Sequence, residues 1–529
     1  MLKVKILSSL AKVFADEEPV SAERASYSML KNERISFQAA FCSDTDTDVT
    51  ASVEGEMSGC TAVYAVKDVP VGLAAFENSD DYYLRKTSGN YPDILMPVNK
   101  TNAKAGVWYS FWFEAAPGGN MTGRKTVVIR LHDIVKEVKL DIKDFSLPDK
   151  KIVYTNWFHC DAVCDYYNVE PFTDEFWRIF GNFAKTASLH GQNCILTPLF
   201  TPALDTAPGG ERTTVQLIGV RVNGGRYTFD FSRLRKWVEI CRSLGIEYFE
   251  LCHFFTQWGA KHAPKIVATD SKGREKKIFG WKTRTSSKKY DDFLRQFSRE
   301  LRKFIDDNGL RDNVFIHISD EPSGDQLKVY RKRAKLIREI FPGYKVMDAL
   351  SEYDFYKSGS VDIPVPSVGR IETFYGKADP LWTYYCCGQG NCNLPNRFIA
   401  MPSLRNRVLG VLLYRYNASG FLQWGYNFYN TSLSLKRINP YEVTDAGGAF
   451  PSGDSFIVYP GKDGEAICSL RLKVLYEGFC DLAALRALEE KEGREKVLEL
   501  TGDISMENYP HDDEWLLSLR ERINALLCG

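Results

Sequence analysis

The stretch VFIHISDEPS, residues 314–323, decides the fold. It begins as a largely apolar run and stops at two adjacent carboxylates, Asp320 and Glu321. Pro322 cannot donate to a strand ladder, and Ser323 is a favourable cap for a helix that we expect from about residue 325 to 341. A buried strand that leads directly into a helix is typical of a βα unit.

The same alternation of strand and helix continues on both sides of this stretch. We expect strands at residues 153–160, 193–200, 248–255, 314–318, 345–350, 362–368, 381–387 and 420–426. Apolar residues at helical spacing predict helices between them, including one at 404–416, and a last helix at 469–490. Eight such units favour an α/β fold with a closed, TIM-like (β/α)8 barrel. An open doubly wound sheet is the alternative, but no glycine-rich phosphate loop follows the first strand.

The two ends of the chain have other patterns. Short alternating runs separated by Gly, Asn and Asp occupy residues 35–41, 107–115 and 125–142. They predict an N-terminal β-sandwich domain over residues 1–146. The segment FSLPDKK, residues 145–151, is expected to be a linker. We then expect the barrel domain at 150–495 and a C-terminal helical extension at 496–529.

Composition excludes several classes of partner. The 529 residues carry 68 Lys and Arg against 68 Asp and Glu, so nothing favours nucleic acid or an anionic membrane. We identify no signal peptide and no membrane span, and the 13 cysteines are odd in number and scattered. A cytoplasmic protein with free thiols is expected, without a metal or cofactor. The oligomeric state is left open.

The carboxyl ends of barrel strands are where an active site is expected. Asp320 and Glu321 repel each other at such an end, which raises one pKa and lets a carboxyl group donate a proton near neutral pH. The competing interpretation is a turn in which Asp320 caps the next helix. Side chains at the other strand ends are candidate substrate contacts: Asn156, His159, His253, Trp258, Trp382, Tyr384, Trp424 and Asn427. His317 lies inside its strand and is interpreted as packing.

A retaining glycosidase usually needs a second carboxylate as nucleophile. The seventh strand, LWTYYCCG at 381–388, has none, and Glu372 and Asp379 lie in the loop before it. One hypothesis is that a 2-acetamido group of the sugar acts as nucleophile, with Glu321 as acid/base and Asp320 orienting the amide. A second is a hydrolase of non-acetamido sugars that uses Glu372. A third is a carbohydrate-binding protein without catalysis.

Several motifs together resemble one family. They are LKNERISFQ at 30–38, HISDEP at 317–322, LWTYYC at 381–386, SGFLQWGYNFY at 419–429, GDSFIVYPG at 453–461 and SLRLKVLYEGFCDLAAL at 469–485. In this order the chain is similar to glycoside hydrolase family 123 and to the related domain-of-unknown-function family 4091.

The resemblance implies an exo-acting β-N-acetylgalactosaminidase that works by substrate-assisted retention, with Asp320 and Glu321 in the roles given above. It implies an oligosaccharide or glycoconjugate with a terminal N-acetylgalactosamine as substrate. Two departures concern sugar specificity. The segment RVLGVLLYRY at 407–416 lacks the family's usual Trp, and Gln423 stands where an aromatic residue is common.

Overall fold

The computed structural model of the protein describes residues 1–149 and 152–529. Its centre is a ring of parallel strands in the order β20-β19-β18-β15-β12-β11-β22-β21. In chain order they are β11 (Val153–Asn156), β12 (Cys194–Thr197), β15 (Tyr248–Leu251), β18 (Val314–Ile316), β19 (Lys345–Ala349), β20 (Ile363–Val365), β21 (Trp382–Tyr384) and β22 (Gly420–Gln423). Ser367 forms a parallel bridge with Tyr384 between the two end strands. The chain thus forms a nearly closed eight-stranded parallel barrel.

All eight predicted strands are present, and each ends before its predicted last residue. The apolar pattern continues beyond the hydrogen-bonded ladder because residues past the strand ends remain buried, as Trp157 and Phe158 do after β11. Sequence periodicity reports burial, whereas the end of a strand is set by where the ladder stops. The extra residues form the loops at the carboxyl end of the barrel.

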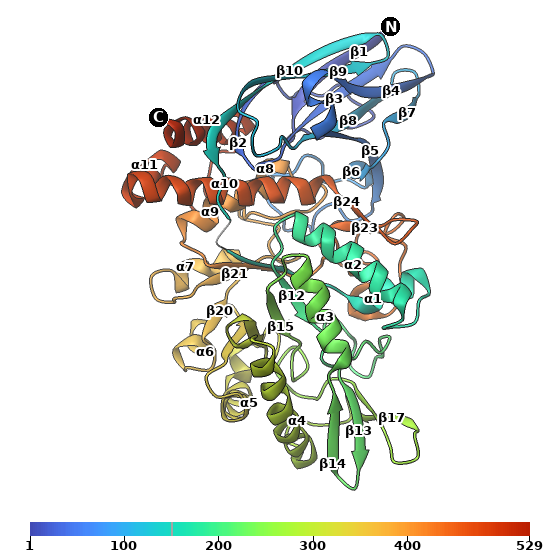
Figure 1. The fold of residues 1–529 in the computed structure, drawn as a ribbon, viewed down its shortest axis with the longest axis vertical. Coiled ribbons are helices and arrows are strands. Elements are labelled where there is room, and N and C mark those ends of the chain that lie inside the picture. The colour runs from blue at the N-terminus through green and yellow to red at the C-terminus, as the bar shows by residue number, and fades with distance from the viewer. Residues whose placement is uncertain (150–151) are drawn as a thin grey trace.

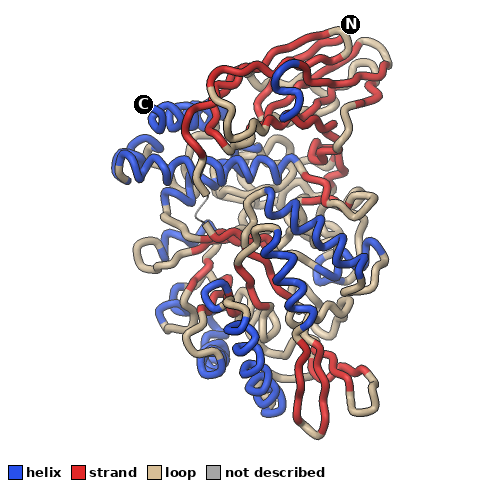
Figure 2. The backbone as a smooth tube through the Cα atoms, viewed as in Figure 1, coloured by secondary structure: helices blue, strands red, loops and turns tan. Residues whose placement is uncertain are grey.

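Helices follow the strands and cover the outside of the barrel (Figures 1 and 2). They are α1 (Cys160–Tyr167), α2 (Asp174–Leu189), α3 (Ser232–Ser243), α4 (Lys288–Asp307), α5 (Leu327–Ile340), α6 (Tyr353–Lys357), α7 (Ile371–Phe374), α8 (Ser403–Arg407), α9 (Leu409–Arg415) and α10 (Leu470–Glu492). The helix predicted at 404–416 is divided into α8 and α9. There α10 passes so closely that a Cβ on Gly410 would lie 1.8 Å from the Gly478 carbonyl oxygen.

Two insertions were not predicted from the sequence. They form a four-stranded sheet of β13 (Gly219–Asn223), β14 (Arg226–Asp230), β16 (Ile266–Thr269) and β17 (Glu275–Phe279). This sheet extends from the far end of the molecule, away from the N-terminus (Figure 1). A further hairpin, β23 (Val458–Pro460) and β24 (Ala466–Cys468), precedes α10.

The N-terminal part consists of two five-stranded sheets. One has the order β1-β3-β8-β5-β6 and the other β2-β10-β9-β4-β7. The strands are β1 (Leu2–Ser8), β2 (Ser26–Lys31), β3 (Ile35–Ser43), β4 (Thr47–Glu54), β5 (Thr61–Val71), β6 (Gly89–Met96), β7 (Lys100–Ala103), β8 (Trp108–Ala115), β9 (Gly123–Leu131) and β10 (Ile134–Ser146). Both sheets contribute to one apolar core, in which Phe37 and Phe113 stack with ring centroids 5.6 Å apart.

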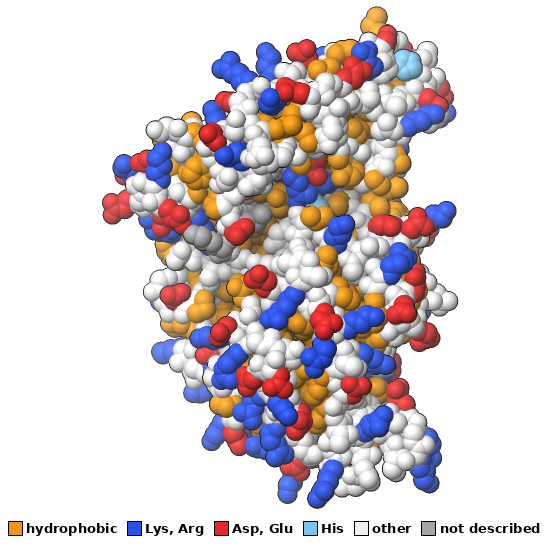
Figure 3. Space-filling view, in the orientation of Figure 1, with side chains coloured by type: hydrophobic (Ala, Val, Ile, Leu, Met, Phe, Trp, Pro, Cys, Tyr) orange, Lys and Arg blue, Asp and Glu red, His pale blue; other side chains and the backbone are white. Residues whose placement is uncertain are grey.

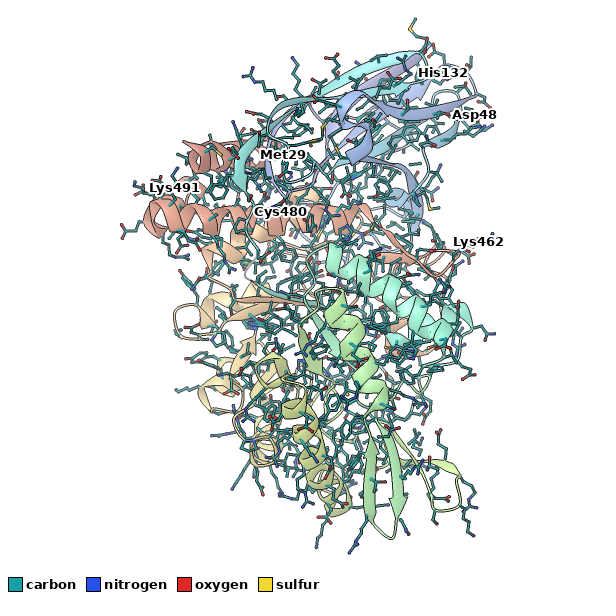
Figure 4. The ribbon with its side chains drawn as sticks, in the orientation of Figure 1. Met29, Asp48, His132, Lys462, Cys480 and Lys491 are labelled. Atoms are coloured by element: carbon teal, nitrogen blue, oxygen red, sulfur yellow. The ribbon has the colours of Figure 1, made fainter. Side chains whose placement is uncertain are left out.

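The run at 125–142 is a hairpin rather than a single strand. It turns at His132, whose φ is 58°, at the tip marked in Figure 4. Phe145 and Ser146, predicted to lie in a linker, still belong to β10. Residues 150 and 151, which include the predicted start of the barrel domain, lie outside the described residues.

Helix α10 runs between the N-terminal sheets and the barrel, with Cys480 near its middle (Figures 1 and 4). Charged side chains in its first half are buried in ion pairs with both sides, such as Arg471 with Asp93 of β6 and Asp481 with Arg407 of α8. Arg471 and Asp481 thus fix the helix in place. The chain ends in α11 (Arg494–Thr501) and α12 (Asp513–Cys528), and α12 packs on β2 and β10.

The surface carries both charges. Lys and Arg side chains are intermingled with Asp and Glu over the face shown in Figure 3. In the part of the chain that the structure describes, no helix is both long and apolar enough to cross a bilayer.

Candidate active site

A cavity of about 280 Å³ lies at the carboxyl ends of the barrel strands. It is lined by Trp157, Leu204, Asp205, Gln257, Trp258, Asp320, Glu321, Ala349, Tyr384, Cys386, Cys387, Leu422, Trp424, Ser432, Leu433 and Phe450. Two larger hollows, of about 730 and 590 Å³, lie elsewhere and contain neither Asp320 nor Glu321. The predicted carboxylate pair therefore lies in the smaller cavity, where a barrel enzyme binds its substrate.

The backbone of the carboxylate pair is held by β19 and by the loop after β15. The N–H of Glu321 donates to the Ala349 carbonyl at 3.1 Å, and the Asp320 carbonyl accepts the N–H of Trp258 at 3.0 Å. Glu321 has a φ of 43°, a left-handed conformation that costs energy for a residue with a Cβ. The hydroxyl of Tyr384 donates to Glu321 Oε1 at 2.7 Å. These contacts fix the direction of the Glu321 carboxyl group.

Burial and the neighbouring charge of Glu321 raise the pKa of Asp320 well above its usual range. The charge of His317 below the cavity opposes this rise without cancelling it. Two interacting carboxyl groups titrate as a unit. Burial and repulsion therefore favour the protonated form of Asp320 beside Glu321, an arrangement suited to a general acid with an ionised partner.

A buried hydrogen-bonded chain supports the pair from below. His317 bonds Glu250 Oε2 through Nε2 and Asp348 Oδ1 through Nδ1, both at 2.9 Å. These two carboxylates overcome the effect of burial and raise the pKa of His317 to about 9, so the imidazole is charged at neutral pH. The prediction that His317 serves only in packing is wrong.

Both ends of this hydrogen-bond network, Glu250 and Asp348, contact residues of the site. Asp348 accepts the backbone N–H of Ile318 at 3.0 Å and that of Ser319 at 3.3 Å, so it holds the segment that leads to Asp320. At the other end, Trp157 of the cavity wall donates its Nε1–H to Glu250 Oε2 at 2.9 Å. The network therefore couples the floor of the cavity to the position of the carboxylate pair.

Three predicted aromatic contacts lie at the cavity. Tyr384 bonds Glu321, and Trp258 is 41% exposed at the opening. Trp424 follows β22, and its Nε1–H donates to Asp454 Oδ2 at 3.0 Å. The family-like motif GDSFIVYPG thus contributes the residue that orients this ring. Aromatic faces placed in this way are suited to stacking on the apolar face of a sugar.

Three other predicted contacts are replaced by structural roles. Asn156 precedes Trp157, and since alternate residues of a strand point to opposite sides, its side chain bonds Tyr154 instead. Trp382 is the first residue of the three-residue strand β21, below its carboxyl end, and packs on Phe315 with ring centroids 5.2 Å apart. The side-chain oxygen of Asn427 accepts a hydrogen bond from the backbone N–H of His159 at 2.8 Å.

The two predicted histidines also lie outside the cavity lining. His159 binds the Trp424 carbonyl at 2.8 Å and faces Arg212, which together with burial lowers its pKa to about 4. The neutral His159 imidazole therefore holds the backbone at Trp424 in place. His253 stacks on His317 with ring centroids 4.3 Å apart, in the layer beneath the carboxylates. Burial, followed by the charge of His317, lowers the pKa of His253 well below its usual range.

Asp205 is a cavity carboxylate that sequence reasoning missed. It lies eight residues beyond the end of β12, and it accepts the backbone N–H of Leu433, 228 residues away, at 3.0 Å. Burial raises its pKa to about 6. No local signal marks such a residue, because its place depends on a contact between two loops. Glu372, by contrast, belongs to α7 and accepts the hydroxyl of Tyr416, so it does not line the cavity.

One group of side chains has the composition of a metal site. Ligand atoms of His253, His317 and Asp348 lie within 4.8 Å of one another. Both nitrogens of His317 already bond carboxylates, however, so a metal ion would have to displace these hydrogen bonds. The geometry fits a proton-bearing network better than a metal centre.

Comparison with known families matches residues 157–488 to the glycoside hydrolase 123 catalytic domain. No curated protein matches the chain. Among solved structures, a family 123 glycoside hydrolase from Clostridium perfringens, described in connection with glycolipid glycan hydrolysis, gives a TM-score of 0.77 at 15% identity. That match covers 100% of this chain and 98% of the other. At this identity the superposition shows a common fold.

Other similarities are much weaker. A family 20 exo β-N-acetylglucosaminidase from Vibrio harveyi matches at 9% identity, over 95% of this chain and 98% of its own, with a TM-score of 0.32. An FMN-binding β-glucuronidase from Facaelibacterium prausnitzii matches at 12% identity, over 86% and 60%, also with 0.32. Neither supports a functional argument. The family match, in contrast, spans more than half of the sequence and includes the carboxylate pair, and the chain therefore belongs to glycoside hydrolase family 123.

Proposed function

We propose that this glycoside hydrolase releases terminal β-linked N-acetylgalactosamine from an oligosaccharide or glycoconjugate, with retention and with the substrate's own 2-acetamido group as nucleophile. The observation that carries the proposal is the placement of Asp320 and Glu321 side by side on one wall of the cavity. The wall formed by the end of β21 and the residues after it contributes Tyr384, Cys386 and Cys387, none of which is a carboxylate. The residues of the cavity thus supply an acid and an orienting carboxylate. The proposal includes a TIM-like (β/α)8 fold for the barrel.

In the first step the acetamido oxygen attacks the anomeric carbon while Glu321 gives its proton to the departing glycosidic oxygen. Asp320 accepts the amide N–H and stabilises the positive charge that develops on the amide. The product is an oxazoline-type ring on the sugar. In the second step Glu321 takes a proton from water, which attacks the anomeric carbon, opens this ring and restores the original configuration.

Substrate binding also places the proton of the carboxylate pair. Burial and the neighbouring charge of Glu321 favour the protonated form of Asp320. The amide N–H of the sugar stabilises the ionised form of Asp320, so the proton moves to Glu321. The Tyr384 hydroxyl holds Glu321 by donating to Oε1 of its carboxyl group. Substrate binding thereby protonates Glu321, the group that acts as the general acid.

A second candidate mechanism keeps a protein nucleophile and a non-acetamido sugar. Glu372 cannot serve from α7, but Asp205 lines the same cavity as Glu321. One oxygen of Asp205 is engaged by the Leu433 N–H, which suits a group that binds a sugar hydroxyl better than one that attacks. A non-catalytic carbohydrate-binding role is opposed by the intact Asp320 and Glu321. A sugar panel that shows binding without turnover would support that role.

The test is hydrolysis of a nitrophenyl β-N-acetylgalactosaminide by three variants. Glu321→Gln is expected to lower kcat by about 10²–10⁴-fold, the usual contribution of a general acid/base. Asp320→Asn is expected to lower kcat/KM by about 10²–10³-fold, as for loss of an oriented charge at the reacting group. Glu372→Gln is the matched control and should retain turnover, because it removes a carboxylate outside the cavity. Turnover by Glu321→Gln close to that of the unaltered enzyme would contradict the proposal.

The place of action is proposed on separate grounds. All thirteen cysteines are free, including pairs that lie close together such as Cys160 and Cys164. Free thiols in this number suit a reducing compartment, and we therefore propose that the enzyme acts in the cytoplasm. Fractionation of cells that express the complete gene would test this.

A further inference from the structure

Two adjacent cysteines, Cys386 and Cys387, line the same cavity as Glu321. Consecutive side chains of a strand point to opposite sides, but β21 ends at Tyr384 and the chain turns after it. Both residues therefore line one cavity. In this sequence Cys386 and Cys387 are the sole instance of neighbouring cysteines.

The backbone of this pair is fixed before any ligand arrives. The N–H of Cys386 donates to Gln389 Oε1 at 2.8 Å, and its carbonyl accepts Asn396 Nδ2 at 2.9 Å. The N–H of Cys387 bonds the carboxylate of Asp454, the residue that also orients Trp424. A ligand that binds both sulfurs therefore meets a preorganised site, which reduces the entropy lost on binding.

The thiol of Cys386 is protonated. A hydrogen bond with the Cys387 thiol, burial and the nearby charge of Glu321 raise the pKa of Cys386 well above its usual range. Reagents that need a free thiolate, such as iodoacetamide, should react slowly here. A reagent with a soft, sulfur-binding atom can bind two thiols at once without a free thiolate, if it also carries a group that accepts their protons.

We propose that Cys386 and Cys387 form a chelating site for trivalent arsenicals, and that occupation of this site closes the catalytic cavity. With an arylarsenoxide, RAs=O, two S–H bonds are broken and two As–S bonds are formed. The two protons leave with the oxygen as water, and neither arsenic nor sulfur changes oxidation state. The aryl group is carried into the cavity beside Glu321. Chelation stands on the cysteine pair alone, whereas the loss of turnover rests on the proposed function.

Other cysteines supply the controls. Cys160 and Cys164 lie one turn apart in α1 but are buried in the core. Cys392 is exposed and close in sequence, but it offers a single thiol without a neighbour in the chain sequence. Cys392→Ser is therefore the matched control for Cys387→Ser.

The experiment treats the full chain with one equivalent of phenylarsine oxide and measures intact mass and hydrolysis in parallel, each variant against its own untreated sample. We expect one phenylarsenic adduct with loss of water, mapped to residues 386–387, and loss of turnover. A dithiol such as 2,3-dimercaptopropanol should reverse both effects, and an equal thiol concentration of 2-mercaptoethanol should not. Cys387→Ser should need about 10²-fold more reagent, because the second sulfur no longer binds intramolecularly. Cys392→Ser should behave like the unaltered chain.

Several results would overturn the inference. They are an adduct on Cys160 and Cys164, equal sensitivity of Cys387→Ser and the unaltered chain, or an adduct at 386–387 that leaves turnover intact. If the chain hydrolyses no acetamido glycoside, the proposed function fails by itself. The mass measurement then still decides whether the dithiol site exists.

Discussion

His317 lies three residues before Asp320 and carries a positive charge in the interior of the barrel. Its partners Glu250 and Asp348 come from β15 and β19, so the three side chains join neighbouring strands as well as supporting the cavity. His317 lies one residue beyond the end of β18 rather than inside the strand as predicted, and the sequence could not show its role. The partners are 67 and 31 residues away, and no local pattern connects them.

The His317 network predicts a pH-dependent stability. Its pKa rises from 6.5 to about 9 on folding, which at 1.36 kcal/mol per unit is worth about 3 kcal/mol. Because the folded-state pKa is the higher one, this stabilisation is complete below pH 6.5 and is lost as the pH rises through about 9. His317→Gln should therefore be about 3 kcal/mol less stable than the unaltered chain at pH 6, and the gap should narrow at pH 9.5. Urea unfolding at both pH values measures this, and a gap independent of pH would contradict it.

At the scale of elements, β22 and the segment after it show how the site is built from distant parts. Trp424 follows the strand, while Asp454, which accepts its Nε1–H, comes thirty residues later. Gln423, noted in the sequence as a departure, is buried and bonds Asp454 and Arg397. Arg471 of α10 holds the carbonyls of Gly453 and Phe456 on either side of this turn. The motifs at 419–429, 453–461 and 469–485 are therefore separate in sequence but pack together in the structure.

This arrangement predicts a change in substrate affinity. Asp454→Ala removes the acceptor of the Trp424 ring, and loss of about 1–1.5 kcal/mol of hydrogen bonding should raise KM for the nitrophenyl glycoside roughly tenfold. The value of kcat should change much less, because Asp320 and Glu321 are untouched. Asp454→Asn keeps an acceptor and is the matched control. Equal KM values for the two variants, with both folded by circular dichroism, would show that Asp454 does not act through Trp424.

Across the whole molecule, strands with strong apolar patterns could be predicted and contacts between loops could not. All eight barrel strands and the carboxylate pair follow from local sequence, because burial and strand ends leave a local pattern. Asp205 and the sheet of β13, β14, β16 and β17 were missed, because long insertions do not follow the strand–helix alternation of a barrel. Asn156 and Trp382 were misplaced because the sequence does not show which side of a barrel strand a residue faces or at which end it lies.

The division into domains stays a prediction. The expected boundaries are 1–146, 150–495 and 496–529, yet buried ion pairs cross them. Lys473 of α10 pairs with Glu114 of β8 at 2.8 Å, and Arg520 of α12 pairs with Glu33 beside β2 at 2.8 Å. Removing one partner of such a pair leaves a buried charge and costs about 3–5 kcal/mol. The N-terminal sheets, the barrel and the last helix therefore depend on one another for stability.

The central claim is that the sugar supplies its own nucleophile while Asp320 and Glu321 orient the amide and move the proton. The most direct measurement is the inhibition constant of an N-acetylgalactosamine-derived thiazoline, which imitates the cyclised intermediate. An analogue of this kind is expected to bind at least about 10²-fold more tightly than the N-acetylgalactosamine product, and Asp320→Asn should lose that preference. If the thiazoline binds no better than the product while the enzyme hydrolyses glycosides that lack the acetamido group, the account is wrong.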